Sequence, residues 1–219
     1  MNTLTKLALG LMGQLKAQPA VGHAGATRKL PRPKLGDGMP LMEALRLRQS
    51  QRDFKPRPLP AKTLSELLWA AAGINRHELG GRTAPSAMNS QEVSVYVALP
   101  EGLYRYEPGP HNLQLVAASD VRRVTGYQDF VDTAPLDLVY VADHSAMPLV
   151  PAGQREPFAY AAAGAMAQNV YLYCASAGLG TVIRAWFDRT ALSRAMGLKP
   201  DQQLLLAQTV GFTVDGGGA

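Results

Sequence analysis

The side chains in this chain that could bind or transform a ligand gather in three short polar segments. The first segment reads Arg46-Leu47-Arg48-Gln49-Ser50-Gln51-Arg52-Asp53-Phe54, so a hydroxyl stands two residues from a guanidinium group on either side. An arginine can hold phosphate oxygens through two parallel charge-assisted hydrogen bonds, and a serine can donate a third. The segment therefore predicts an anion site at Arg48, Ser50 and Arg52, with a solvated basic helix end as the alternative.

The second segment is a polar turn that leads directly into a strand-like run. It reads Arg82-Thr83-Ala84-Pro85-Ser86-Ala87-Met88-Asn89-Ser90-Gln91-Glu92. An asparagine side chain carries a donor and an acceptor in one plane, which matches the alternating polar edge of a pyrimidine-like ring. Asn89 is therefore a candidate for binding a heterocycle, and the alternative is that Asn or Ser caps the turn.

The third segment joins an apolar helical run to a later helix and reads Gly178-Leu179-Gly180-Thr181-Val182-Ile183-Arg184-Ala185-Trp186-Phe187-Asp188. Its Gly-x-Gly lacks the third glycine and the preceding strand of a dinucleotide-binding fold. Taken alone, this pattern indicates the C-terminal end of a helix.

Several other function classes are disfavoured by the composition. The chain has 219 residues, 47% of them hydrophobic, and a net charge of +5, which suits an anionic ligand. Its basic residues are spread along the chain without a nucleic-acid-binding module, so no nucleic-acid partner is expected. A single cysteine, Cys174, excludes an internal disulfide and is expected to be a buried apolar residue. There is no Gly-x-Ser-x-Gly motif, and no metal-ligand spacing is found among His23, His77, His111 and His144.

Helical periodicity appears in four places. Apolar spacing predicts helices over Leu41 to Leu47 and Leu64 to Gly73. The run from Phe158 to Ala177 is apolar almost all round and rich in alanine, which predicts a buried helix that packs closely against the core or against a second copy of the chain. Asp188 is expected to cap a last helix that stops at Gly197.

Strand patterns occupy the middle and the end of the chain. Val93 to Val97 alternates, and the runs at Leu103–Tyr106 and Leu113–Val116 flank a Pro-Gly-Pro turn, which indicates a hairpin. Leu136 to Ala142 and Leu204 to Phe212 are apolar and predict buried strands. Helices and strands are thus intermixed with at least one hairpin, and the expected fold class is α+β.

Residues 1–40 differ from the rest and are expected to form an N-terminal arm and a Pro/Gly-rich linker, before a single domain at 41–219. Residues 28–40 are dense in proline, glycine and cations, which disfavours a helix or a central strand. A short apolar run after Lys6 faintly resembles a signal peptide, but Gln14 and Lys16 interrupt it. A helical or mobile arm and a cytoplasmic location are therefore favoured, with export to the periplasm as the alternative. No stretch approaches the length that would insert in a membrane.

In order and spacing, the three segments resemble the nitroreductase family of flavoproteins over about Leu41 to Phe212. The family's Arg-x-Ser-x-Arg/Lys appears as Arg48-Gln49-Ser50-Gln51-Arg52, and its Pro-Ser-x-x-Asn-Ser-Gln appears as Pro85-Ser86-Ala87-Met88-Asn89-Ser90-Gln91. The runs at Leu67–Ala71, Arg82–Ala87 and Gly102–Tyr106 are most similar to the branch that includes the azoline-oxidising dehydrogenases of peptide modification.

This resemblance implies a central, mostly antiparallel sheet flanked by helices and a homodimer with FMN at its interface. Arg48 and Ser50 would bind the FMN phosphate, Arg52 would approach the N1/O2 side of the ring, and Asn89 would bond its polar edge. The loop beneath flavin N5 would be Arg184-Ala185-Trp186, where many relatives carry Glu-Gly. Gln49 and Ser86 lie within the two motifs and complete the expected FMN-binding set: Arg48, Gln49, Ser50, Arg52, Ser86, Asn89, Arg184, Ala185 and Trp186.

Two departures from the family pattern concern the phosphate and the ring. Trp186 is bulky where relatives carry glycine, so it could narrow the pocket. Relatives also supply a C-terminal cation to the phosphate, whereas no cation follows Lys199 here. Arg82 or Arg184 is expected to replace it, or FMN binds more weakly.

The activity implied is transfer of a hydride from NAD(P)H through FMN to a small nitroaromatic, quinone or similar acceptor, with no protein residue as a covalent catalyst. The alternatives are a flavin-dependent dehydrogenase of a heterocycle or peptide-derived substrate, and a flavin-binding protein without turnover.

Overall fold

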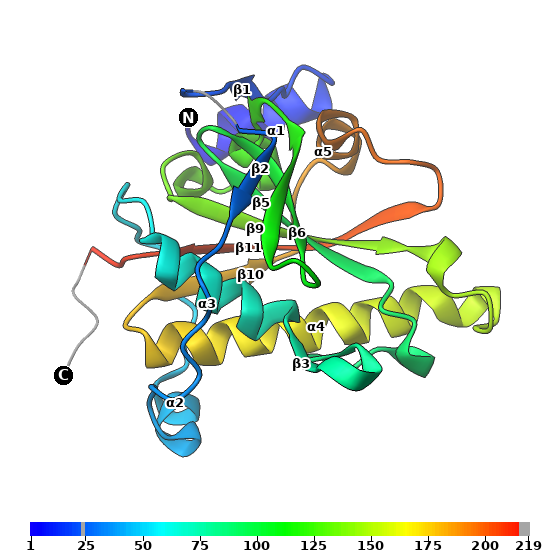
Figure 1. The fold of residues 1–219 in the computed structure, drawn as a ribbon. Helices are drawn as coiled ribbons and strands as arrows, with labels where there is room; N and C mark the ends of the chain where they lie inside the picture. The colour runs from blue at the N-terminus through cyan, green and yellow to red at the C-terminus, as the bar shows by residue number, and fades with distance from the viewer. Residues whose placement is uncertain (23–24, 215–219) are drawn as a thin grey trace.

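A seven-stranded sheet lies at the centre of the computed structural model, which describes residues 1–22 and 25–214 (Figure 1). Its strands follow the order β10-β11-β9-β5-β6-β7-β2, and every neighbouring pair is antiparallel. The strands are β2 (Thr27–Lys29), β5 (Val93–Leu99), β6 (Gly102–Glu107), β7 (Asn112–Ala117), β9 (Leu136–Asp143), β10 (Gly180–Arg184) and β11 (Gln202–Gly211). The expected α+β fold with an antiparallel sheet is confirmed.

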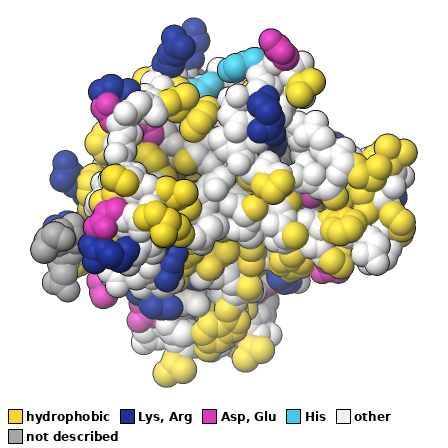
Figure 2. Space-filling model, turned by 90° about the horizontal axis from the view of Figure 1, so that it is seen from below, with side chains coloured by type: hydrophobic (Ala, Val, Ile, Leu, Met, Phe, Trp, Pro, Cys, Tyr) yellow, Lys and Arg dark blue, Asp and Glu magenta, His cyan; other side chains and the backbone are white. Residues whose placement is uncertain are grey.

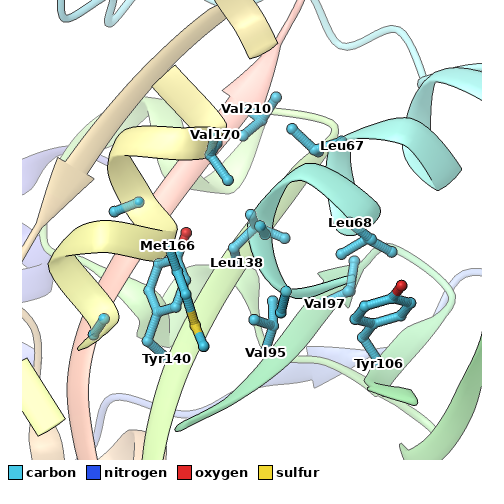
Figure 3. Packing of buried hydrophobic residues seen from close by; sticks show 14 of the residues in the cluster. Leu67, Leu68, Val95, Val97, Tyr106, Leu138, Tyr140, Met166, Val170 and Val210 are labelled. Carbon is cyan, nitrogen blue, oxygen red and sulfur yellow. The ribbon is translucent and has the colours of Figure 1, made fainter. Parts of the chain in front are cut away.

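One face of the sheet packs against α3 (Ala61–Ala72) and α4 (Ala152–Ser176). Leu138 and Tyr140 of β9 point into this layer, where they meet Leu68 of α3 and Met166 of α4 (Figure 3). Burying such side chains contributes about 1.5–3 kcal/mol each, so this layer is the main hydrophobic core. It holds α4 against the sheet.

The opposite face is covered by α5 (Arg189–Met196) and by the N-terminal segment that contains α1 (Thr3–Leu11) (Figure 1). Val139 and Val141, which alternate with the residues of the first layer, pack here with Leu192 of α5. Because both faces of β9 are buried, the strand is apolar without alternation. This explains why its sequence is recognised as a buried strand.

Local sequence signals account for the helix ends. Asp188 Oδ1 accepts a hydrogen bond from Ala191 N–H at 2.9 Å, and Gly197 ends α5 in a left-handed conformation with φ 64°, as predicted. Helix α2 (Leu41–Leu47) also matches its prediction. Helix α4 begins at Ala152, earlier than expected, and includes Pro157 as its sixth residue. Because proline has no N–H, the Gly153 carbonyl loses its helical hydrogen bond there, and the helix continues in spite of this cost.

Residues 12–22 and 25–40 run along the surface of the main body and add short strands to it. Strand β1 (Gln18–Pro19) pairs with β8 (Ser119–Asp120), and β2 adds to the outer edge of β7. Met39 N–H donates to Ser176 Oγ at the end of α4. The segment expected to be a linker therefore includes an edge strand, which its proline-rich flanks still allow.

The remaining elements are short. A small hairpin joins β3 (Ile74–Arg76) and β4 (Gly81–Arg82), and single-turn 3-10 helices are found at His77–Leu79, Ala87–Asn89, Arg122–Thr125, Asp129–Asp132 and His144–Ala146.

Candidate functional site

The first polar segment runs along the free side of β10, the edge strand of the sheet. An edge strand has outward N–H and C=O groups that need partners outside the sheet. Gln51 N–H donates to the Thr181 carbonyl at 3.0 Å. The segment reaches this edge because Arg48, the residue that follows the last helical residue of α2, has a ψ of 120° and turns the chain out of the helix. The sheet edge thus positions residues 48–52.

Tyr171 of α4 connects this segment to β10. Its hydroxyl lies 2.8 Å from Ser50 Oγ and accepts a hydrogen bond from Ile183 N–H at 3.0 Å. Either hydroxyl can be the donor in the Tyr171–Ser50 bond, because a phenol oxygen that accepts from the backbone keeps both its own proton and a second acceptor site. Tyr171 thus fixes the position of Ser50 Oγ at the edge.

Arg48 and Arg52 give the edge its positive charge. The guanidinium of Arg48 lies over the Tyr171 ring, 5.3 Å from its centroid, and Arg52 is exposed. Within residues 1–22 and 25–214, neither arginine forms an ion pair. Both charges are therefore available to an external anion.

A cavity of about 390 Å³ opens beside this edge, next to the end of α4. The cavity is lined by Gln49 and Gln51 of the first segment, by Thr181 of β10, and by Tyr171 and Cys174 in the last turns of α4. Burial raises the pKa of the Cys174 thiol, so this cysteine stays neutral and serves as packing, as the sequence predicts. The cavity volume lies within the range of ligand sites in proteins.

The second segment forms a separate, tightly turned loop. Met88, Asn89 and Gln91 all have positive φ angles of 51–53°. Ser86 Oγ accepts a hydrogen bond from Gln91 N–H at 3.0 Å, which holds the turn closed. Asn89 is exposed and lines another cavity, of about 470 Å³, together with Ser86 and Arg76. A single chain therefore does not bring Asn89 into the cavity beside Ser50.

The third segment ends β10 and presents two exposed residues. Ala185 and Trp186 are exposed after the buried Arg184. The Trp186 ring lies 5.3 Å from the ring of Tyr127, measured between centroids. The loop is therefore exposed, and its tryptophan contacts one aromatic neighbour.

The side chain of Arg184 points away from the surface into the layer below α5. It forms an ion pair with Asp137 and donates to the Thr125 carbonyl at 2.6 Å and to Thr209 Oγ1 at 2.7 Å. Burial lowers the pKa of Arg184, and the Asp137 carboxylate opposes that shift. In the described chain this guanidinium is therefore held inside the fold, and its role at the phosphate stays a prediction.

Arg82 is also placed away from the motif edge. It donates to the Val93 carbonyl at 3.3 Å, and burial lowers its pKa. It does not line the cavity beside Ser50. The other predicted cation is thus not assembled with Arg48 in one chain, and residues 215–219 of the C-terminal segment lie outside the described residues.

Sequence reasoning missed Tyr171, which lies in the helical run recognised as apolar. Its hydroxyl was a usable signal, because a phenol in a buried helix needs a hydrogen-bond partner. Which partner it finds depends on the packing of α4 against β10, and no sequence spacing reports that.

The described part of the chain contains no cluster of His, Cys, Asp and Glu that could hold a metal ion. His23 lies outside it. In the same residues, no helix combines the length and apolar character that crossing a bilayer requires.

Comparisons with known proteins point to one family. The model of the nitroreductase family matches residues 45–212. A protein of Methanocaldococcus jannaschii that carries the name nitroreductase is 31% identical over 159 residues, covering 68% of this chain and 80% of the relative. A solved structure from Ralstonia eutropha JMP134, also named as a nitroreductase, is 55% identical with a TM-score of 0.88, covering 92% of this chain and 96% of the other.

Two more distant structures share the fold. One, from Desulfovibrio desulfuricans, is named as a nitroreductase in complex with FMN; it is 22% identical with a TM-score of 0.60, covering 83% of this chain and 90% of the other. The other belongs to the Escherichia coli microcin synthetase McbBCD complex with truncated pro-MccB17 bound. It is 17% identical with a TM-score of 0.67, covering 97% of this chain and 93% of the other.

Proposed function

The chain belongs to the nitroreductase family of oxidoreductases, and from this premise we propose that it binds FMN and passes a hydride from NAD(P)H to a small organic acceptor such as a nitroaromatic or a quinone. The observation that carries the proposal is the set of anion-binding groups on the β10 edge. Arg48, Ser50 and Arg52 follow one another at alternate positions along this edge, and the two arginines have no carboxylate partner among the described residues. The intervening Gln49 and Gln51 line the cavity of about 390 Å³.

The residues at this edge fit the phosphate of FMN by their chemistry. Two guanidinium groups and one hydroxyl supply charge-assisted donors, and Tyr171 holds the hydroxyl in place. Asp53, which follows the motif, forms no ion pair with Arg52 in the described chain. We therefore assign Arg48 and Ser50 to the phosphate.

The other predicted residues would contact the ring. Arg52 would balance negative charge near the N1/O2 side, and the backbone N–H of Ala185, an exposed residue, would donate to N5. When bound, the isoalloxazine supplies the redox chemistry, and the protein orients the donor and the acceptor. Gln49 stays a predicted contact, since it lines the cavity beside the phosphate edge.

We also propose a homodimer. Hydrophobic side chains are found on the underside of the molecule, where α2 and α4 lie (Figure 2). Leu41, Met42 and Phe158 are exposed there by 62%, 76% and 41%. Exposed apolar patches of this kind mark protein interfaces. A site shared between two chains would also account for the separation of Ser50 from Asn89, because the Asn89 loop of one chain would bond the ring edge of an FMN whose phosphate lies at Ser50 of the other.

A second activity is favoured by one comparison. The fold is shared with a component of the McbBCD complex, which agrees with the branch indicated by the sequence motifs. A flavin-dependent dehydrogenase of a heterocycle or a peptide-derived ring would use the same FMN site, with electrons passing from the substrate to oxygen. For either activity we expect a small-molecule or ring substrate and a cytoplasmic location.

Anaerobic absorbance spectroscopy of the purified protein tests cofactor and direction together. Flavin bands that bleach on addition of NADH or NADPH would support the hydride-transfer proposal. Bleaching by a heterocyclic substrate without NAD(P)H would favour the dehydrogenase. Bound FMN that no donor reduces would favour a flavin-binding protein without turnover, and a protein that cannot be reconstituted with FMN would refute all three. Sedimentation velocity of the FMN complex tests the dimer, which a monomer that holds FMN would contradict.

A further inference from the structure

Helix α1 is attached to the body by a buried charged residue in addition to the apolar contact of Leu9. Lys6 is fully buried, whereas Leu4 and Leu11 on the same helix are 78% and 89% exposed. Lys6 Nζ lies 2.7 Å from Asp132 Oδ1 and donates to the Gln128 carbonyl at 2.8 Å. A buried ion pair contributes little net stability but strongly specifies position, because leaving either charge unpaired is costly. The position of α1 therefore depends on Lys6.

The residues that lead into α1 border an open cavity that contains Arg52. This cavity, of about 490 Å³, is lined by Met1 and Asn2, the two residues before α1, and by Arg52, Phe54 and Phe130. Thr3 Oγ1, in the first turn of α1, donates to Asp129 Oδ1 at 2.5 Å, next to Phe130. The start of α1 thus lies beside a residue that the proposed function assigns to the flavin ring.

The same cavity lies close to the β10 loop. The ring of Phe130, which lines it, faces the guanidinium of Arg184 at 5.7 Å. Arg184 directly precedes the exposed residues Ala185 and Trp186. The proposed function assigns Arg52, in this cavity, and the loop that carries Trp186 to the same flavin ring, and Phe130 connects the two through Arg184.

The end of α1 reaches Trp186 through one aromatic residue. A Cβ atom at Gly10 would lie 2.9 Å from Tyr127 Cε1 and from its hydroxyl, so α1 approaches Tyr127 closely only because residue 10 is glycine. Tyr127 in turn contacts Trp186, with 5.3 Å between ring centroids and an angle of 59°. A continuous line of contacts thus joins α1 to Trp186.

We propose that α1 is the outer wall of the acceptor opening, and that Lys6 and Tyr127 are positioning residues that hold Trp186 at its rim and so limit entry to small acceptors. The inference rests on the proposed function for the identity of the opening. Release of α1 would free Trp186 and admit bulkier planar acceptors. Lys6 and Tyr127 would thus set acceptor size without touching the acceptor.

The link to Trp186 can be measured without cofactor. The chain has two tryptophans, so Trp69→Phe leaves Trp186 as the sole indole reporter. In that background, Lys6→Met should raise acrylamide quenching of the FMN-free protein about two-fold. Trp186 is 52% exposed in the wild-type structure, so its full release would about double the surface open to the quencher. Lys16→Met, an exposed lysine on the same arm, is the matched control and should leave the quenching unchanged.

Tyr127→Ala should raise the quenching by a similar factor, and adding Lys6→Met to it should have no further effect, because the contact has already been broken. Tyr127→Ala also carries the test if Lys6→Met does not fold. Unchanged quenching in these variants would overturn the link between α1 and Trp186.

The second measurement tests acceptor size and uses the FMN-loaded enzyme with both tryptophans present. The ratio of kcat/KM for a three-ring quinone to that for benzoquinone should rise several-fold in Lys6→Met and stay constant in Lys16→Met. A quenching change with a constant ratio would overturn the assignment of the wall to the acceptor. Failure to bind FMN would count against the proposed function instead, and the quenching measurement would still decide the link.

Discussion

Replacing Tyr171 with phenylalanine removes a single oxygen atom from the motif edge and tests how Ser50 is held. The ring that Arg48 contacts stays in place, so the cation–π contact is retained. What is lost is the bond to Ser50 Oγ at 2.8 Å and the bond from Ile183 N–H at 3.0 Å.

The two lost bonds differ in their effect. Ser50 is exposed, so water can replace the phenol there and the loss in stability is small. The N–H of Ile183 makes no other hydrogen bond in the described part of the chain, and leaving this part-buried donor unsatisfied costs about 1–3 kcal/mol. We expect Tyr171→Phe to lower the free energy of unfolding by about 2 kcal/mol and the melting temperature by about 4–8 °C for a chain of this size.

The effect on FMN should follow the other bond. With Ser50 no longer oriented, FMN affinity should fall by about ten-fold, or about 1.4 kcal/mol. Ser50→Ala removes the donor itself and should weaken FMN by about 10- to 100-fold, the range for a hydrogen bond to a charged group. It should change stability little, because Tyr171 keeps its bond to Ile183.

Urea unfolding at one fixed protein concentration and titration of FMN fluorescence measure the two effects. Tyr173→Phe is the matched control: it is the same change on the same helix, but its hydroxyl contacts Thr63 and Glu66. We expect wild-type FMN affinity for this control. If Tyr171→Phe binds FMN as tightly as the wild type while Ser50→Ala does not, the proposed orientation of Ser50 is refuted.

Three further predictions concern the packing behind the site. Arg184→Met leaves the Asp137 carboxylate buried without its partner and should lower the free energy of unfolding by about 3–5 kcal/mol in urea; adding Asp137→Leu should recover much of the loss. Burial lowers the pKa of His111 below its ordinary value of 6.5. The folded protein thus binds the proton less readily than the unfolded chain, and the melting temperature should fall as the pH drops from 7.5 to 5. Gly180→Ala places a Cβ atom 2.9 Å from Gln51 Cβ, so it should shift the motif and weaken FMN in the fluorescence titration.

Each of these predictions has a control or a contradicting result. An unchanged urea midpoint for Arg184→Met would contradict the assigned ion pair. His111→Asn tolerates the positive φ of 49° at this position and should flatten the pH dependence of melting. Gly109→Ala in the turn between β6 and β7, where a Cβ atom meets nothing within 4 Å, should leave FMN affinity unchanged.

The elements of the fold could largely be predicted because their signals are local. Periodicity and runs of apolar residues identified α2 and the strands β5 to β7, β9 and β11, and the capping residues Asp188 and Gly197 marked the last helix. The order of the polar motifs was also enough to indicate the family, which the family model confirms over residues 45–212.

The assembly of the site could not be predicted in the same way, because it depends on contacts between distant segments. Arg184 is the last residue of β10, yet its side chain lies in the interior, where it pairs with Asp137, 47 residues away in sequence. Tyr171 was hidden in a helix that reads as apolar, and its role appears only once α4 packs beside β10.

The sequence by itself determined the fold class, the main elements and the residue types of an anion site, since propensities, periodicity and motif spacing act over a few residues. The tertiary structure decided which cations remain free, which hydroxyl orients Ser50, and where the N-terminal arm lies. The physical reason is that burial and pairing of a charge depend on whatever the fold brings beside it, as Asp132 is brought to Lys6.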